Sequence, residues 1–426
     1  MPKIGFVGLT HLGIVSAVSA ASKGFTVSAV QDDLSLVKRL NCNQLPIEEP
    51  GLDDLLNTHR PLISFSTEFK NLEECDIIYI AVDVPTDDNG TSDLGVVEHL
   101  INKTINVLKD QACLIVLCQV PPGFTRKINL PPERLYYQVE TLVFGSAVER
   151  ATNPERFIIG SSQPNQAIAQ PVKKYLDAFD CPILPMQYES AELAKISINM
   201  CLIASVSVAN MMADLSSRLG ADWMEIVPAL KLDKRIGAFA YLNPGLGISG
   251  GNLERDLATV ISLASESGAQ ANVASQYLVD SQHRKKWVLR TLHESGVLGI
   301  SNPKIGILGL AYKENTTSTK NSPAIEVIKS LPSATINVFD PLIKPEGADK
   351  NVPWDFLISH QTAEAVFSGA DAILILTPWP EFDSLDISHL SREMNGKTII
   401  DPFRMINTQI CTAQNLDHHS LGRTKL

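Results

Sequence analysis

The sequence predicts an α/β protein in which two doubly wound domains are joined by a central helical region. Short apolar strands alternate with helical segments at both ends of the chain, a pattern typical of parallel sheets. The stretch KIGFVGLTHL, which starts at Lys3, returns as KIGILGLAYK from Lys304, so this type of domain occurs twice. About thirty residues from Ser190 contain neither proline nor an internal glycine. We therefore expect domains at residues 1–187, 188–297 and 298–426, with a long helix in the middle one.

The N-terminal domain is expected to open with a strand, a helix and a second strand. KIGFVGL is a short apolar strand broken by Gly8, the small-residue helix that follows ends at Gly24, and FTVSAV is the next strand. CDIIYIAV and ACLIVLCQV are two further buried strands, and each precedes a loop that contains proline. This order describes a βαβ unit that extends into a parallel sheet.

The centre of the chain is expected to be helical. The segment from Ser190 would span roughly 45 Å at 1.5 Å per residue, and Gly220 is suited to end it. A further helix should start after Asp222, because an N-cap aspartate followed three residues later by Glu225 is a capping-box pattern. INVFDP, DAILILTP and KTIIDPF then supply the later strands of the second α/β domain.

Composition indicates a globular protein in aqueous solution, with 44% hydrophobic and 19% charged residues. The formal net charge of −11 argues against nucleic acid or an anionic membrane as a partner, so an anionic ligand would need local basic groups. Seven scattered cysteines without a CxxC pair favour free thiols in a reducing cytoplasm over a disulfide frame or a metal site. The apolar N-terminus fits a strand, turn and helix better than a signal peptide, and no segment is a convincing membrane span.

The first turn, residues 8–13, follows a strand and opens a helix, as a Rossmann-like dinucleotide-binding turn does. Such a turn needs one glycine for the bend, a second for the pyrophosphate and a third for helix packing, but Thr10 holds the middle position. Gln31 stands where an acid usually binds the adenosine ribose. It can bond a hydroxyl without repelling a 2′-phosphate, but no arginine is adjacent. We therefore expect NAD, with NADP not excluded; a domain that no longer binds a dinucleotide is the alternative.

Two further features carry polar groups. Lys195 and Asn199 lie four residues apart and so share one face of the expected long helix, either as a hydrogen-bonding station or as part of a site. The segment NPGLGISGGNLERD, residues 243–256, is a glycine-rich loop of the kind that lets a ligand approach the backbone. Asp256 at its end either caps a helix that starts near Leu257 or belongs to the same site.

A series of short motifs runs through the chain in a fixed order. They are the glycine turn, PIEEPGLDDLL, AVDVPTDDNGTSDLG, QVPPGFTR, AELAKISIN, KRIGAFAYLNPGLGISGG, GLAYKENT with SPA, and DAILILTPWPEF. In this order the chain resembles the UDP-glucose/GDP-mannose dehydrogenase family over nearly its whole length. The resemblance implies an NAD-dependent enzyme that oxidises the C6 alcohol of a nucleotide sugar to a carboxylate in two hydride transfers. In that family a cysteine traps the aldehyde, and the second transfer leaves a thioester that water hydrolyses.

The resemblance also assigns catalytic positions. The family loop P-G-x-G-F-G-G-x-C-x-P-K-D brings Asn252 to the position of the cysteine, and an amide cannot form a thioester. Lys195 and Asn199 match the lysine and asparagine that stabilise the alkoxide and orient water. Asp256 matches the aspartate that handles protons, and Glu140 matches the first acid of N-P-E-F-L-x-E-G. Two departures are Phe144 at the second acid and Gln119 in place of a threonine.

The remaining expected contacts concern the cofactor and the substrate. The cofactor set is Gly8, Thr10, His11, Leu12, Gly13, Gln31, Val82 and Lys320. The substrate set is Arg235, Tyr241, Leu242, Asn243, Gly245, Lys313 and Arg404, and no residue is assigned to a metal. Retained cations in an acidic chain suit an anionic ligand such as a diphosphate, although Arg404 could instead be a solvated surface charge. By analogy Arg235 is lent to a neighbouring subunit, so we expect a homodimer.

A further departure is that GFTRKINLPPERLYYQVE is shorter than the equivalent family stretch, which predicts a trimmed helix and strand. Three functions remain open. The enzyme either removes one hydride and stops at an aldehyde or ketone, or oxidises an aldehyde hydrate directly to the acid, or binds nucleotides without turnover as a partner or regulator. The substrate is a nucleotide sugar or a related phosphorylated alcohol.

Overall fold

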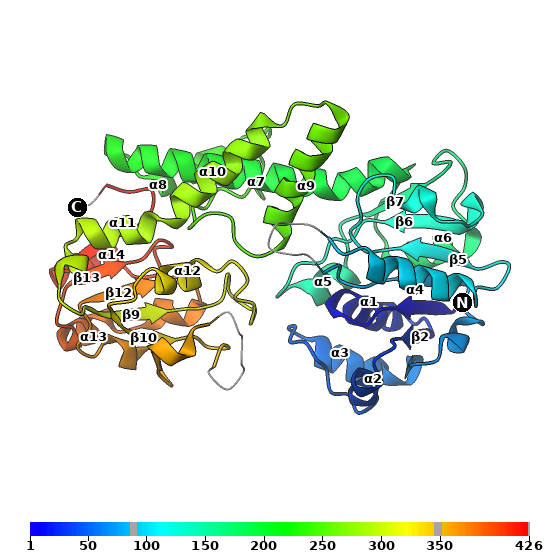
Figure 1. Ribbon diagram of the computed structural model, residues 1–426, viewed down its shortest axis with the longest axis horizontal. Helices are drawn as coiled ribbons and strands as arrows, with labels where there is room; N and C mark the ends of the chain where they lie inside the picture. The colour runs from blue at the N-terminus through cyan, green and yellow to red at the C-terminus, as the bar shows by residue number, and fades with distance from the viewer. Residues whose placement is uncertain (86–91, 345–351, 425–426) are drawn as a thin grey trace. The chain divides into compact units, whose positions relative to one another are not determined.

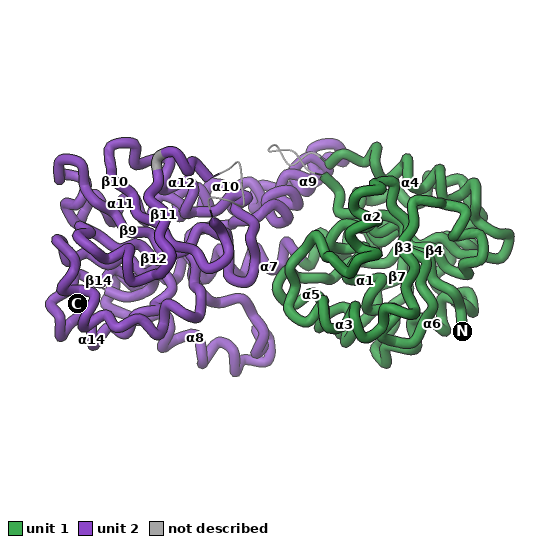
Figure 2. The backbone as a smooth tube through the Cα atoms, turned by 90° about the horizontal axis from the view of Figure 1, so that it is seen from below, with its two compact units in different colours: residues 1–198 green, residues 199–426 purple. Residues whose placement is uncertain are grey.

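The computed structural model describes residues 1–85, 92–344 and 352–424. These residues form two compact units, Met1–Ile198 (unit 1) and Asn199–Leu426 (unit 2), which Figure 2 colours green and purple. Helix α7 (Tyr188–Leu219) belongs to both, because it runs across the boundary. Residues 86–91 of the motif AVDVPTDDNGTSDLG lie outside the described residues. The division at residues 187 and 297 stays a prediction.

Unit 1 is built on an eight-stranded sheet with the order β3-β2-β1-β4-β5-β6-β7-β8. Its strands are β1 (Ile4–Val7), β2 (Val27–Val30), β3 (Ile63–Ser66), β4 (Ile77–Ile80), β5 (Cys113–Val116), β6 (Leu135–Gln138), β7 (Phe157–Ser161) and β8 (Ile183–Gln187). The expected doubly wound sheet is confirmed, with the difference that β7 pairs antiparallel with β6. The strand order reverses direction between β1 and β4, and ligands of such sheets bind at the carboxyl ends of strands at that point.

Helices cover both faces of this sheet, as Figure 1 shows. They are α1 (His11–Ser22), α2 (Leu34–Asn41), α3 (Leu52–His59), α4 (Gly95–Ile105), α5 (Ala147–Thr152) and α6 (Gln170–Leu176). One apolar core packs α1, α3 and α6 against the strands, and a second core packs α4 and the start of α7 against the other face. The connection from β5 to β6 contains two 3-10 turns, Thr125–Lys127 and Pro132–Arg134, and its trimming relative to the family stays a prediction.

Unit 2 contains a six-stranded parallel sheet with the order β11-β10-β9-β12-β13-β14. Its strands are β9 (Lys304–Leu308), β10 (Thr335–Phe339), β11 (Leu357–Ser359), β12 (Ala372–Ile375), β13 (Thr398–Ile400) and β14 (Asp417–His419). Its helices are α8 (Trp223–Leu232), α9 (Asn252–Ser267), α10 (Asn272–Lys285), α11 (Trp287–Glu294), α12 (Pro323–Lys329), α13 (Ile387–Leu390) and α14 (Thr408–Ala413). A single apolar core joins α11 and α12 to the strands.

The central helices begin and end largely where the sequence indicates. Gly220, with φ +77°, follows the last residue of α7, and the Asp222 carboxylate accepts the Met224 N–H as the N-cap of α8. The expected start of the next helix near Leu257 is wrong. Helix α9 begins at Asn252 and places Asp256 in its second turn, so Asp256 does not cap it.

Helix α7 is the one helix in the described ranges that is long and apolar enough to cross a membrane, judged by length and composition alone. Its polar side chains bond within each unit: Lys195 pairs with Glu140 in unit 1, and Asn199 bonds to Asp256 in unit 2. Such bonds are typical of a central helix in a globular protein, where polar groups find partners as the helix packs.

Candidate active site

The glycine turn of unit 1 leaves no room for side chains at its first and last glycines. Gly8 has φ +92°, and a Cβ there would lie 2.8 Å from Val82 Cβ. A Cβ at Gly13 would lie 1.7 Å from the Gly8 carbonyl oxygen and 2.7 Å from that of Ala81. The backbone therefore has the tight bend and the close packing of helix on sheet that a dinucleotide turn requires.

Thr10, at the middle position, ties the turn to the loop after β4. Its Oγ1 accepts the Asp83 N–H at 2.8 Å, while the Asp83 carboxylate accepts the Leu12 N–H at 3.2 Å. Sequence analysis missed Asp83, although it follows the candidate residue Val82 directly. Its negative charge lies at the N-terminus of α1, where the helix dipole and the exposed N–H groups favour an anion.

Gln31, at the end of β2, also supports the turn. Its Oε1 accepts the Leu9 N–H at 3.0 Å, so the amide nitrogen of its side chain remains as the donor for a ribose hydroxyl. The two acids behind it have structural partners. Asp32 pairs with Lys103 at 2.9 Å, and Asp33 accepts the Ser35 and Leu36 N–H groups as the N-cap of α2.

Two catalytic candidates of unit 1 lie together. Lys195 Nζ is 3.0 Å from Glu140 Oε2, and the two side chains are 13% and 18% exposed. Glu140 stands in the loop after β6, and its carboxylate also accepts the Leu142 N–H. An ammonium donates hydrogen bonds and a carboxylate accepts them, so the pair can orient a substrate hydroxyl.

His11 and Glu49 form a second polar pair beside this loop. His11 Nε2 lies 2.8 Å from Glu49 Oε1, and the ring of Phe144 packs 4.2 Å from the imidazole ring, centre to centre. The Glu49 carboxylate also accepts the Gly145 and Ala147 N–H groups. Glu49 was missed as a site residue, although it belongs to the quoted motif PIEEPGLDDLL.

In unit 2 the structure brings Asn199, Arg255 and Asp256 together. The Asn199 amide donates to one carboxylate oxygen of Asp256, and Arg255 Nε lies 3.1 Å from the other. Asp256 is fully buried, and its two neighbours are more than nine-tenths buried. A buried carboxylate held by a cation and an amide has a fixed orientation, as a group that handles protons requires.

The glycine-rich loop packs closely against its neighbours before it enters α9. The Gly245 N–H donates to Asn210 Oδ1 at 2.8 Å, and Gly247, with φ +97°, would clash with Ser281 if it carried a Cβ. Gly251 faces Lys320, whose side-chain atoms lie 3.2 to 3.4 Å from the place of a Cβ. Gly251 immediately precedes Asn252, the exposed first residue of α9.

All seven cysteines lie in the described ranges, and four of them, Cys75, Cys113, Cys118 and Cys411, are buried. Cys201 stands two residues after Asn199 on α7, which turns it about 200° around the helix. Burial raises the pKa of Cys411 to about 11 and that of Cys118, at the end of β5, to about 12. These buried thiols therefore stay protonated at neutral pH and are poor nucleophiles.

The residues expected to bind substrate differ in their exposure and in their contacts. Arg235 is largely exposed and pairs with Asp233 at 2.6 Å, and the Lys313 ammonium lies 5.8 Å from the ring centre of Tyr312. Tyr241 and Asn243 are exposed, whereas Leu242 is buried and its carbonyl accepts the Trp223 indole N–H. The loop that leads into α9 contains Tyr241, Leu242, Asn243 and Gly245.

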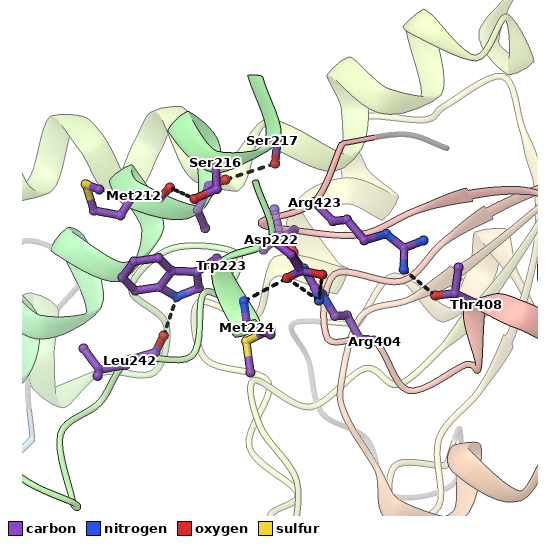
Figure 3. Close-up of polar contacts among 12 residues, drawn as sticks. Met212, Ser216, Ser217, Asp222, Trp223, Met224, Leu242, Arg404, Thr408 and Arg423 are labelled. Carbon is purple, nitrogen blue, oxygen red and sulfur yellow. Dashed lines mark hydrogen bonds and ion pairs between the residues drawn. The ribbon is translucent and has the colours of Figure 1, made fainter. Parts of the chain in front are cut away.

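The side chain of Arg404 binds other parts of unit 2. Its NH1 lies 2.8 Å from Asp222 Oδ1, and its Nε and NH2 donate to the Leu421 carbonyl, as part of the contacts seen in Figure 3. Arg423 donates to Thr408 in the same region. The guanidinium of Arg404 thus fastens the C-terminal segment to the start of α8, and the geometry lends no support to its expected role in substrate binding.

A doubly wound sheet with a dinucleotide turn, a paired lysine and carboxylate, and a second α/β domain define a dinucleotide-dependent dehydrogenase. The chain belongs to the UDP-glucose/GDP-mannose dehydrogenase family. The NAD binding domain of that family matches residues 2–177, its central domain residues 189–279 and its UDP binding domain residues 306–408. The protein is accordingly an NAD-dependent dehydrogenase of alcohol groups, and NAD is its cofactor.

Known relatives are similar along almost their whole length. UDP-glucose 6-dehydrogenase TuaD of Bacillus subtilis is 27% identical over 99% of this chain and 94% of its own. UDP-glucose 6-dehydrogenase of Rickettsia bellii is 29% identical over 98% of this chain and 99% of its own. Among solved structures, a UDP-glucose dehydrogenase from Pyrobaculum islandicum has a TM-score of 0.82 at 27% identity, with 94% of both chains covered. A UDP-D-ManNAc dehydrogenase from Pyrococcus horikoshii shares the fold, with a TM-score of 0.84 at 23% identity and full coverage of both chains.

Proposed function

We propose that the protein oxidises an alcohol of a nucleotide sugar with one NAD and releases the aldehyde. In this step the carbon gives a hydride to NAD, the hydroxyl gives up its proton, and the products are aldehyde and NADH. The proposal rests on Asn252, the residue that the motif resemblance aligns with the family's cysteine. Without a thiol the aldehyde forms no thiohemiacetal, and the second hydride transfer has no covalent intermediate to act on.

The catalytic groups that remain suit the first transfer. Lys195, paired with Glu140, is a positioned cation for the developing alkoxide, and Asn199, held by Asp256, is a positioned amide donor. Both interactions are made by residues that lie four positions apart on α7. Neither interaction requires sulfur. Loss of the thiol should therefore prevent the second hydride transfer, while the groups for the first transfer remain.

The proposed substrate class rests on the UDP binding domain and on cations near the glycine-rich loop. Relatives with matching length act on UDP-glucose according to their names. In this chain Arg235 and Lys313 are the candidates for contacts with the diphosphate. A sugar nucleotide fits these features better than a free sugar, because its diphosphate is an anion that arginine and lysine side chains bind.

We also propose a cytoplasmic homodimer. Helix α7 exposes Val208, Met211, Leu215 and Leu219, which recur at intervals of three and four residues and so form one apolar stripe. An exposed apolar stripe on a long helix is favourable for association with a second copy. The Arg235 side chain is 87% exposed and pairs with Asp233, and the resemblance implies that it reaches a neighbouring subunit.

The direct test is a screen of nucleotide sugars with NAD, followed by absorbance of NADH and by product mass. The proposal expects a product two hydrogens lighter than the substrate that reacts with a hydrazine reagent for aldehydes. A sugar acid as the end product would show that an aldehyde hydrate is oxidised directly. If no nucleotide sugar reduces NAD although NADH binds, the protein is a nucleotide-binding relative without turnover.

A further inference from the structure

We propose that His11, oriented by Glu49, accepts the proton of the substrate hydroxyl during hydride transfer. The inference rests on the proposed oxidation, but it concerns only the first hydride transfer. It assigns a catalytic role to His11, which the sequence places among the cofactor contacts, and a positioning role to Glu49, which has no role assigned by the resemblance. The pair occupies the neighbourhood of residue 144, where the family has its second acid and this chain has phenylalanine.

In this pair the imidazole of His11 forms a hydrogen bond through one ring nitrogen, Nε2, to the carboxylate of Glu49. Nε2 of His11 lies 2.8 Å from Glu49 Oε1, and their side chains are 9% and 1% exposed. Within residues 1–85, 92–344 and 352–424 no hydrogen bond reaches Nδ1 of His11. When Nε2 donates its proton to Glu49, Nδ1 carries the lone pair and can accept a proton. A carboxylate that holds the far nitrogen of a histidine is a recurring arrangement for a general base.

The carboxylate is itself fixed, so the orientation of the imidazole is defined. Both oxygens of Glu49 accept the Gly145 N–H, at 2.9 and 3.0 Å, and one accepts the Ala147 N–H at the start of α5. The ring of Phe144 covers the imidazole at 4.2 Å and shields the pair from water. Two backbone N–H groups thus fix the carboxylate of Glu49, and the carboxylate in turn holds Nε2 of the imidazole.

The His11 and Glu49 pair also connects the glycine turn with the loop that carries Glu140. His11 is the first residue of α1 and belongs to the glycine turn, while Glu49 binds the loop that carries Glu140. Other charged groups in this neighbourhood are Asp83, which binds the Leu12 N–H, the Glu140 and Lys195 pair, and Arg150, which donates to the Thr141 carbonyl.

The proposed step is balanced. The substrate carbon transfers its hydride to NAD, the O–H proton moves to His11 Nδ1, and the C–O single bond becomes a carbonyl. The charge that appears on the imidazole is matched by the carboxylate of Glu49. His11 then returns the proton to water, and the pair is ready for a second turnover.

The first test replaces His11 with glutamine, which keeps a polar side chain but has no titratable nitrogen. We expect kcat to fall by about a hundredfold or more, the range that general base catalysis contributes. The dissociation constant for NADH, measured by fluorescence, should stay within about threefold of wild type. In the wild type kcat should decline below neutral pH with one inflection in the range where histidines titrate, and that inflection should vanish in the variant.

The second test separates a catalytic pair from a structural one. Glu49→Gln keeps a hydrogen-bond acceptor but removes the charge, so the inflection in kcat should move to lower pH. In the background of His11→Gln, Phe144→Glu should recover part of kcat with an inflection in the acidic range, whereas Phe144→Gln should recover nothing. His389→Gln, at an exposed position in α13, is the control and should leave kcat unchanged.

The inference is overturned if His11→Gln keeps both its kcat and the inflection, or if NADH affinity is lost while kcat is retained, which would make His11 a cofactor ligand only. A sugar acid as product would refute the single oxidation but not this step, because both reactions share the first hydride transfer. If the wild type reduces no NAD with any nucleotide sugar, both proposals fall.

Discussion

Single side chains set the chemistry of the glycine turn and of the loop that precedes α9. Thr10 and Gln31 use their oxygens to hold the turn, through the Asp83 and Leu9 N–H groups. The extra atoms of Thr10 therefore bond to the protein as well as narrowing the approach to the phosphates. Our proposal for residue 252 depends on the difference between a thiolate, which can capture an aldehyde, and an amide, which cannot.

Replacement of Asp83 by asparagine should tighten the binding of NAD. The carboxylate accepts the Leu12 N–H at the N-terminus of α1, and its charge opposes the cofactor diphosphate there. Removal of one charge at a helix terminus is worth roughly 1 kcal/mol, or about a fivefold lower dissociation constant. Fluorescence titration with NADH measures it, with Asp110→Asn, an exposed acid elsewhere in unit 1, as the control. Unchanged or weaker binding in Asp83→Asn would contradict this account.

Replacement of Asn252 by cysteine should extend the reaction to the acid. The residue is the first of α9 and follows Gly251, which lies beside the Lys320 side chain; a helix N-terminus and a nearby cation both favour a thiolate. We expect two NADH per sugar nucleotide and a carboxylate product, detected by mass. Asn252→Ser is the matched control, since its hydroxyl is a far weaker nucleophile, and it should still yield the aldehyde. An aldehyde from Asn252→Cys as well would show that the thiol is not the missing element.

The secondary-structure elements show which features can be predicted from local sequence and which require the folded chain. The strands around Gly8 and Gly309, helix α1 and the N-cap of α8 follow from apolar runs, glycines and capping residues, and these are local signals. The start of α9 at Asn252 is different. Its first turn is held by the Glu254 contact with Lys285 at 2.9 Å and by Asn321, partners from distant segments.

The same distinction applies to the site. Lys195, Asn199 and Asp256 could be named from spacing and resemblance, and the structure shows the partner of each. The pairing of His11 with Glu49 joins residues 38 positions apart, and the bond from Arg404 to Asp222 joins residues 182 apart. No local pattern encodes such contacts, because they exist only after the sheet and helices have packed.

Helix α8 provides a test at the scale of an element. Asp222 caps the helix through the Met224 N–H and binds Arg404 from the C-terminal segment. Asp222→Ala should lower the free energy of unfolding by about 1 kcal/mol for the cap alone, with a further loss for the ion pair. Asp222→Asn keeps a capping oxygen and should lose less. Urea unfolding followed by circular dichroism measures both, and equal stability of Asp222→Ala and wild type would contradict the role of this contact.

For the whole molecule, the apolar stripe on α7 predicts a dimer that covers Cys201. This residue lies seven positions before Val208, on the same side of the helix, and it is exposed in the single chain. In the native wild type, alkylation should modify the exposed Cys42 but not Cys201. Leu215→Asp should give a monomer by light scattering in which both thiols react. A wild-type monomer with a reactive Cys201 would contradict the proposed dimer.

The central claim is that the oxidation ends at the aldehyde because residue 252 has no sulfur. The most direct measurement is the amount of NADH formed when a limiting amount of the nucleotide sugar has been consumed, together with the mass of the product. The account predicts one NADH per sugar nucleotide and a product that is two hydrogens lighter. Two NADH per sugar nucleotide with a carboxylate product would contradict it.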